Sequence, residues 1–236
     1  MKMLMCDLDG TLLVNEKDKL SEAFITKLKK LTDCGVIFAV NSGRHYSSLK
    51  GLLRRIENRT VFVCNHGTQI MYKNCLLYKN PVPKASALKL CGMGLSASLY
   101  PYVCLREEVL PVALKKDEMP AFINQDIFKI IFVKEKADIS SVQKLKSLGE
   151  ALNLRVCFED DVYLEFCNKE ANKGTATNYL KNKFGIKNGV CAFGNDENDI
   201  PMFLNADKAY IVGPFGKVSF KGATYIESAQ EFIIKM

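Results

Sequence analysis

The chain has 236 residues, of which 48% are hydrophobic and 25% charged, and its net charge is +7. These values are those of an ordinary globular protein with one large domain or two modest ones. No apolar run approaches the ~20 residues that a membrane span needs, and the first strand begins at once, so we expect neither a membrane segment nor a signal peptide.

The positive charge does not point to a nucleic-acid partner. The basic residues are dispersed and reach only short pairs such as Lys29-Lys30, with no basic stripe interleaved with aromatic residues. A mild attraction for small phosphorylated anions is the inference we draw from the charge. The nine cysteines contain no C-x-x-C pair, so we expect free, buried thiols in a reducing cytoplasm rather than disulfides or zinc.

The first third of the chain alternates strand and helix, as in a parallel α/β sheet. The expected order is a strand at 2–7, a helix at 19–32, a strand at 36–40, a helix up to Ile56 and a strand at 61–64. The carboxyl ends of parallel strands meet at one edge of the sheet, and proteins of this kind bind ligands there.

Two carboxylates follow the first strand, in the segment Asp7-Leu8-Asp9-Gly10-Thr11. Positions two apart on a strand face the same side, so we expect the side chains of Asp7 and Asp9 to lie close together. Like charges at that distance are costly unless a cation lies between them, and hard oxygen donors favour Mg²⁺. Taken alone, the segment could equally be an Asp-Gly turn after a strand.

The pattern changes near Pro81 and Pro83. From 84 to 167 we expect helices beside neighbouring antiparallel strands, which is typical of a small α+β domain. The expected elements are a helix from 84, a strand at 98–105, an undefined stretch at 117–125, a strand at 128–133, a helix at 138–152 and a hairpin of 156–158 with 162–166.

The α/β alternation then resumes. The expected elements are a helix at 174–184, a strand at 190–193, a loop at 194–199, a helix at 200–205, a strand at 209–212 and a helix at 228–235. The sequence therefore predicts an α/β fold with a Rossmann-like parallel-sheet core, discontinuous over 1–80 and 168–236, and an inserted α+β domain over 81–167.

Four groups of residues near the expected strand ends have the chemistry that phosphoryl transfer needs. The acidic pair is the first. Ser42 and Gly43 are the second, because a hydroxyl and N–H groups before a helix can hold phosphate oxygens. Lys173, also just before a helix, can neutralise a phosphoryl group. The fourth is a loop of oxygen ligands, Gly194-Asn195-Asp196-Glu197-Asn198-Asp199.

Each group also has an ordinary structural explanation. Ser42 alone would be a helix N-cap, Lys173 alone a solvated lysine, and the loop at 194–199 an N-cap with turn residues. That loop is too short for an EF-hand and has the wrong spacing. The occurrence of all four groups together favours phosphoryl transfer.

With these motifs the chain resembles the haloacid dehalogenase-like (HAD) superfamily, in the Cof-like branch of the class IIB phosphatases. The motifs that carry the resemblance are Asp7-Leu8-Asp9-Gly10-Thr11, Ser42-Gly43-Arg44, Asn172-Lys173-Gly174, Gly194 with Asn198-Asp199, Tyr163-Leu164-Glu165-Phe166 and Asp199-Ile200-Pro201-Met202-Phe203. The resemblance spans essentially the whole chain. It implies a HAD-like core and a cap, formed by 81–167, that closes over the leaving group and determines the substrate.

The resemblance implies a role for each member of the acidic pair. Asp7 would be the nucleophile that forms an aspartyl-phosphate. Asp9 would protonate the leaving alkoxide and then deprotonate the attacking water. Mg²⁺ would bridge Asp7, the backbone carbonyl of Asp9, the acidic loop and a phosphoryl oxygen.

The remaining motif residues would bind the substrate. Ser42, Gly43, Lys173 and Asn198 are expected to bind the other phosphoryl oxygens. Arg44 is expected to reach a second part of the substrate. His66 lies in a core loop that faces the cap and can equally be structural.

One position departs from the family. The family usually has Gly-Asp where this chain has Gly194-Asn195, so a neutral amide replaces a ligating carboxylate. The Asn195 oxygen can still ligate, with less charge attraction, and Asp196 or Asp199 could serve as the direct ligand. We expect Mg²⁺ to bind, but more weakly.

The predicted function is a cytoplasmic, Mg²⁺-dependent phosphatase of small phosphorylated metabolites, with sugar phosphates first, acting as a monomer or weak homodimer. A phosphomutase with the same covalent chemistry is one alternative. A sugar-phosphate-binding regulatory protein with weakened catalysis is another, because Asn195 could mark lost activity. A receiver-like signalling module is disfavoured by the inserted domain.

Overall fold

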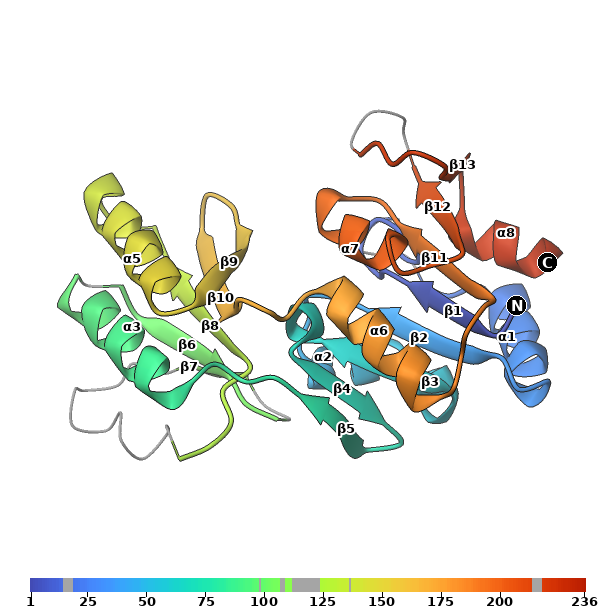
Figure 1. Ribbon diagram of the computed structural model, residues 1–236, viewed down its shortest axis with the longest axis horizontal. Helices are drawn as coiled ribbons and strands as arrows, with labels where there is room; N and C mark the ends of the chain where they lie inside the picture. The colour runs from blue at the N-terminus through green and yellow to red at the C-terminus, as the bar shows by residue number, and fades with distance from the viewer. Residues whose placement is uncertain (15–18, 98, 107–108, 112–123, 136, 214–217) are drawn as a thin grey trace.

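The computed structural model describes residues 1–14, 19–97, 99–106, 109–111, 124–135, 137–213 and 218–236. These residues form an eight-stranded sheet and a five-stranded sheet, each with its own helices. The two layered units lie side by side along the long axis of the molecule (Figure 1).

The eight-stranded sheet has the order β13-β12-β11-β1-β2-β3-β4-β5. The strands from β13 to β3 are parallel, whereas β4 and β5 run antiparallel at one edge. The chain passes from β1 to β2 and β3 on one side and returns through β11 and β12 on the other, so β1 lies where the strand order reverses. Ligands bind at such a point. The strands are β1 (Met3–Cys6), β2 (Ile37–Asn41), β3 (Thr60–Cys64), β4 (Gln69–Tyr72), β5 (Cys75–Lys79), β11 (Val190–Gly194), β12 (Lys208–Val212) and β13 (Thr224–Ile226).

Helices cover both faces of this sheet. Side chains alternate along β1, so Leu4 and Cys6 join the hydrophobic core on one face, and Met3 and Met5 join the core on the other. The first face is covered by α1 (Glu22–Asp33), α2 (Tyr46–Leu52) and α8 (Ala229–Lys235), and the second by α6 (Lys173–Lys183) and α7 (Ile200–Phe203). Both faces of the eight-stranded sheet are therefore buried under helices, and the polar residues lie at the strand ends.

The five-stranded sheet is antiparallel, with the order β7-β6-β8-β10-β9. Two helices cover one of its faces, and the core between them contains Phe132 and Phe166, whose rings meet edge to face. The other face is turned toward the first sheet and carries Lys129 and Glu165. The elements are α3 (Lys84–Ser96), β6 (Pro101–Cys104), β7 (Val109–Pro111), β8 (Lys129–Val133), α5 (Ile139–Ala151), β9 (Leu154–Glu159) and β10 (Tyr163–Asn168).

The predicted fold class, an α/β parallel-sheet core with a separate α+β unit, is confirmed. The residue limits assigned to the two domains stay a prediction. The chain crosses between the units near Pro81 and Asn168, where the Asn168 amide donates to the Pro81 carbonyl oxygen at 3.1 Å.

The sequence reading missed the β4–β5 hairpin and the short strands β7 and β13. The hairpin turns on Lys73 and Asn74, both with positive φ, and no Asn-Gly or Asp-Gly pair marks it in the sequence. The strand expected at 98–105 is β6, and residues 98 and 117–123 of the expected elements lie outside the described residues.

All nine cysteines are free, as predicted, but Cys34 and Cys75 are exposed rather than buried. No helix in the described ranges is both long enough and apolar enough to cross a bilayer.

Candidate active site

The loop after β1 places Asp7 and Asp9 in different surroundings, one buried and the other partly exposed to solvent. The Asp7 N–H continues the sheet by donating to the Phe193 carbonyl oxygen at 2.8 Å, and the Asp7 side chain is buried. The chain then turns tightly, with the Gly10 N–H donating to the Leu13 carbonyl oxygen at 2.7 Å. Asp9 lies on this turn with its carboxylate half exposed, and both residues line the same cavity, so the expected close approach of the two carboxylates stays a prediction.

Gly10 is required at this turn for two reasons. Its φ is +78°, in the region that L side chains rarely adopt. A Cβ on Gly10 would also lie 2.2 Å from the side-chain nitrogen of Asn195. The Asp-Gly pair is therefore what lets the loop of β1 approach the loop of β11.

A buried lysine joins the two ends of the site. Lys173 Nζ lies 2.7 Å from Asp7 Oδ1 and 2.6 Å from Asp199 Oδ1, and all three side chains are buried. Burial raises the pKa of Asp7 to about 7, although Lys173 lowers it. Burial lowers the pKa of Lys173, but the two carboxylates outweigh this effect and raise the pKa above its ordinary value. Lys173 is thus a fixed cation beside Asp7.

The start of α6 fixes the position of this lysine. Asn172 caps the helix, and its side-chain oxygen accepts from the N–H groups of Gly174 and Thr175 at 2.8 and 2.9 Å. A Cβ on Gly174 would lie 2.4 Å from the Pro201 carbonyl oxygen, so this glycine lets α6 pack close to α7.

Asp199 organises the acidic loop from beneath. Its second oxygen accepts from the backbone N–H groups of Asn195 at 2.9 Å and Asp196 at 3.1 Å. Its side chain is fully buried and both of its oxygens are occupied. In this arrangement Asp199 positions the loop, and its expected role as a direct metal ligand stays a prediction. Asp196 is exposed and lines the cavity described below.

The Asn195 amide faces a group of oxygens. One polar atom of this amide lies 3.2 Å from Asp7 Oδ2, 3.0 Å from the Asp9 carbonyl oxygen and 3.0 Å from Thr11 Oγ1. With the amide nitrogen in this position, Asn195 donates to these oxygens. With the amide oxygen in this position, oxygen atoms of Asp7, the Asp9 main chain and Asn195 converge. Oxygen ligands of this kind suit Mg²⁺. The residues present therefore fit the metal.

The loop after β2 supplies the predicted phosphate-binding groups. Ser42 is buried, and its Oγ accepts from the Arg44 N–H at 3.1 Å. The Arg44 guanidinium makes a two-pronged ion pair with Asp9, with Nε 2.9 Å from Oδ2 and Nη2 2.8 Å from Oδ1. Arg44 thus contacts the predicted acid–base residue, an interaction that the sequence reading did not anticipate.

These residues surround one cavity of about 310 Å³. A larger hollow of about 500 Å³ lies at the other end of β2 and β3, but no carboxylate is among the described residues that line it. The chemistry therefore assigns the site to the smaller cavity. Its lining combines predicted residues from the first sheet with residues of the second: Asp7, Asp9, Ser42, Gly43, Arg44, His66, Lys129, Phe158, Glu165, Lys173, Asn195, Asp196 and Asn198.

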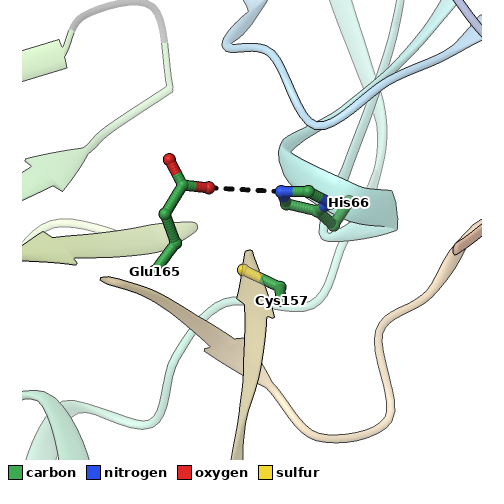
Figure 2. Close-up of side chains that lie close together, drawn as sticks. All are labelled: His66, Cys157 and Glu165. Carbon is green, nitrogen blue, oxygen red and sulfur yellow. Dashed lines mark hydrogen bonds and ion pairs between the residues drawn. The ribbon is translucent and has the colours of Figure 1, made fainter. Parts of the chain in front are cut away.

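From the sequence we expect residues 81–167 to close over the leaving group, but we assign no site role to Lys129 or Glu165. Lys129 and Glu165 each stand within an otherwise apolar strand, and that lone charge is the signal that could have identified them. Lys129 Nζ lies 2.9 Å from Glu165 Oε2 and donates to the Gly43 carbonyl oxygen at 3.1 Å. His66 Nε2 lies 3.2 Å from the same Glu165 oxygen (Figure 2). The two sheets are therefore linked at the wall of the cavity.

Comparisons with known proteins identify the family. The profile of the haloacid dehalogenase-like hydrolase family matches residues 4–109 and 106–229. An HMP-PP phosphatase of Cronobacter sakazakii is 28% identical over 226 residues, which cover 88% of this chain and 82% of that protein. An HMP-PP phosphatase of Yersinia pseudotuberculosis is 25% identical over 239 residues, with coverages of 88% and 82%.

Two solved structures share the fold. A Streptococcus mutans protein superposes with a TM-score of 0.79 at 20% identity, covering 99% of this chain and 98% of that one. The HAD subclass IIB sugar phosphatase BT4131 superposes with a TM-score of 0.74 at 15% identity, covering 98% and 95%.

Proposed function

Because the chain belongs to the haloacid dehalogenase-like hydrolases and is a phosphatase of small phosphorylated metabolites within that family, we propose that it hydrolyses phosphoric monoesters through an aspartyl-phosphate on Asp7. The observation that carries this proposal is the position of Asp7 on the cavity wall, at the strand where the sheet order reverses. One of its oxygens is held by Lys173 and the other faces the Asn195 amide.

The first step is attack by a carboxylate oxygen of Asp7 on phosphorus, with cleavage of the bond to the leaving oxygen. The Ser42 hydroxyl and the Lys173 ammonium bind the phosphoryl oxygens, with Gly43 and Asn198 at the same cavity wall. Because Lys173 is already held between two carboxylates, its charge needs little reorganisation as negative charge builds up on the phosphoryl group.

Asp9 carries the proton. It protonates the leaving alkoxide, then takes a proton from the water that attacks the aspartyl-phosphate and regenerates Asp7. For the first transfer the Asp9 carboxyl must turn away from Arg44 and toward the leaving oxygen. Arg44 then becomes able to contact an anionic or hydroxylated part of the substrate.

Mg²⁺ would be held by Asp7, the main-chain carbonyl of Asp9 and Asn195, with Asp196 at the cavity wall as a further oxygen donor. When bound, it supplies positive charge that screens the nucleophile from the phosphate and orients the phosphoryl group.

Residues 81–167 act as the cap in this proposal. Lys129, Phe158 and Glu165 bring that segment to the cavity wall, where it would exclude water and contact the leaving group. The cap therefore recognises the leaving group rather than the phosphoryl group.

Two substrate classes are supported by relatives. The HMP-PP phosphatases match over most of their length, and the sugar phosphatase BT4131 shares the fold. We infer that a sugar phosphate or a phosphorylated cofactor precursor is the substrate. The nine free cysteines support a reducing cytoplasm as the location.

The proposal is tested by measuring phosphate release from HMP-PP, a set of hexose phosphates and p-nitrophenyl phosphate, with Mg²⁺ and with EDTA. We expect release that depends on Mg²⁺ and is lost in Asp7→Asn. Isomerised sugar phosphate without free phosphate would indicate a mutase, and binding without turnover would indicate a regulatory protein. Either result would refute hydrolysis.

A further inference from the structure

Glu165 stands opposite Phe158 on the open face of the second sheet. The two residues are directly paired across β10 and β9, so their side chains point to the same side. Both line the cavity that contains Asp7. Phe158 is 42% exposed, which is unusual for an aromatic side chain on a sheet face, whereas the Glu165 side chain is only 12% exposed. An apolar ring and a carboxylate therefore meet side by side above the nucleophile.

One oxygen of Glu165 is fully engaged. Oε2 receives both the Lys129 ammonium at 2.9 Å and the His66 ring nitrogen at 3.2 Å (Figure 2). Burial raises the pKa of Glu165, but His66 and Lys129 outweigh that effect and lower the pKa below its ordinary value, so the side chain is a carboxylate. Lys129 is itself buried and is anchored to the Gly43 carbonyl oxygen. The carboxylate is thus held rigidly.

The other oxygen of Glu165 has no donor within the described ranges of the chain. In Figure 2 it is directed away from His66. The fully buried side-chain oxygens without a partner among the described residues are those of Asn41 and Asn65, so Oε1 of Glu165, a residue that lines the cavity, is not fully enclosed. A rigid carboxylate with one unused acceptor, beside the reacting centre, is suited to bind a hydrogen-bond donor.

A metal ion is the competing explanation. His66, Cys157 and Glu165 present ligand atoms within 4.8 Å of one another (Figure 2). However, the ammonium group of Lys129 already lies against Glu165 and would repel a second cation in this buried place. The cluster therefore favours a neutral donor group over a metal.

We propose that Glu165 is a specificity residue, whose Oε1 accepts a hydrogen bond from a hydroxyl or amino group of the leaving group while Phe158 covers an adjacent apolar face. The proposal rests on the proposed function, since it concerns the substrate of the same cavity. A hexose and an aminated heterocycle each combine a hydrogen-bond donor with an apolar face, so both kinds of leaving group fit this arrangement. The experiment decides between them.

The test compares three phosphoric monoesters on the full-length protein with Mg²⁺. Glucose 6-phosphate offers hydroxyl donors, 4-aminobenzyl phosphate offers an amino group on a ring and no hydroxyl donor, and p-nitrophenyl phosphate offers no donor. The variant is Glu165→Gln. Its single carbonyl oxygen is held by Lys129 and His66, so an N–H₂ group that cannot accept takes the place of Oε1. Glu159→Gln, on the same hairpin but paired with Lys134 and Lys146 outside the cavity, is the matched control.

We expect Glu165→Gln to lower kcat/KM about tenfold to a hundredfold on the donor-bearing ester that the wild type prefers, as for loss of a hydrogen bond to a charged group. Most of the loss should appear in KM, the loss on p-nitrophenyl phosphate should be clearly smaller, and the control variant should behave like the wild type. Preference for glucose 6-phosphate identifies a sugar, and preference for 4-aminobenzyl phosphate an aminated ring.

Three results overturn the proposal. The first is an equal loss on all three esters, which would make Glu165 structural. The second is no loss on any ester, and the third is a wild type that does not prefer a donor-bearing ester to p-nitrophenyl phosphate. If Glu165→Gln folds poorly, the double variant Glu165→Met with Lys129→Met removes both charges together and is measured instead. Failure of the proposed function is distinct, since no ester would then be hydrolysed in an Asp7-dependent way.

Discussion

Replacing Asn195 with aspartate should tighten Mg²⁺ binding and destabilise the protein without metal. The amide atom that the carboxylate would replace lies 3.2 Å from Asp7 Oδ2. Two unit charges at that distance repel by about 5 kcal/mol at an effective dielectric constant near 20. Side-chain movement and water relieve part of this energy, so we expect a net loss of about 1–3 kcal/mol in metal-free stability.

Mg²⁺ should offset the loss of stability that Asn195→Asp causes in the metal-free protein. The added carboxylate increases the charge of the oxygen donor set, and ligand charge is a main determinant of the affinity of such sites. We expect the Mg²⁺ dissociation constant to fall about tenfold to a hundredfold, equivalent to about 1.4 to 2.7 kcal/mol. The variant would then be less stable than the wild type in EDTA and gain more from saturating Mg²⁺.

The assay is thermal unfolding of both proteins across a Mg²⁺ titration, with calorimetric titration of the metal, so that neither readout depends on turnover. The control is Asn188→Asp, which adds the same charge at the opposite end of β11, where Asn188 is exposed. An unchanged Mg²⁺ affinity in Asn195→Asp, or an equal gain in Asn188→Asp, would refute the assignment of Asn195 to the metal site.

Two further substitutions probe the same loops. Lys173→Met leaves the buried carboxylates of Asp7 and Asp199 without their cation, so the free energy of unfolding should fall by about 3–5 kcal/mol and phosphate release should stop. Denaturant titration and a phosphate assay measure the two effects. Wild-type stability of the variant would contradict the buried ion pair. Gly10→Ala places a methyl group against Asn195 at an unfavourable φ, so Mg²⁺ binding should weaken in the same calorimetric titration, and unchanged binding would show that the two loops do not meet.

Much of this architecture could be predicted from local sequence alone. The buried parallel strands are continuous apolar runs, and the residues that follow them carry the polar groups, so Asp7 and Ser42 could be assigned to one edge of the sheet before their contacts were known, whereas Lys173 was assigned from its position before a helix. The turn at 73–74 could not, because its two left-handed residues are Lys and Asn rather than the usual glycine pair.

What the sequence could not provide was the pairing of charges across loops. Nothing in the spacing of Asp9 and Arg44 indicates that they form an ion pair, and β1 ends at Cys6, so strand periodicity does not describe the turn on which Asp9 lies. The contact between Glu165 and Lys129 could not be predicted either, since it depends on how β10 pairs with β8. Long-range partners of this kind follow from the topology, which local patterns do not specify.

The covalent role of Asp7 is tested most directly by rapid quenching of the working enzyme followed by mass spectrometry of the peptide that contains residues 1–14. With Mg²⁺ and a turned-over phosphoric monoester, the account predicts that this peptide gains the mass of one phosphoryl group, located on Asp7 and absent from Asp7→Asn. Steady turnover with no such adduct at any quench time, or turnover that persists in Asp7→Asn, would contradict it.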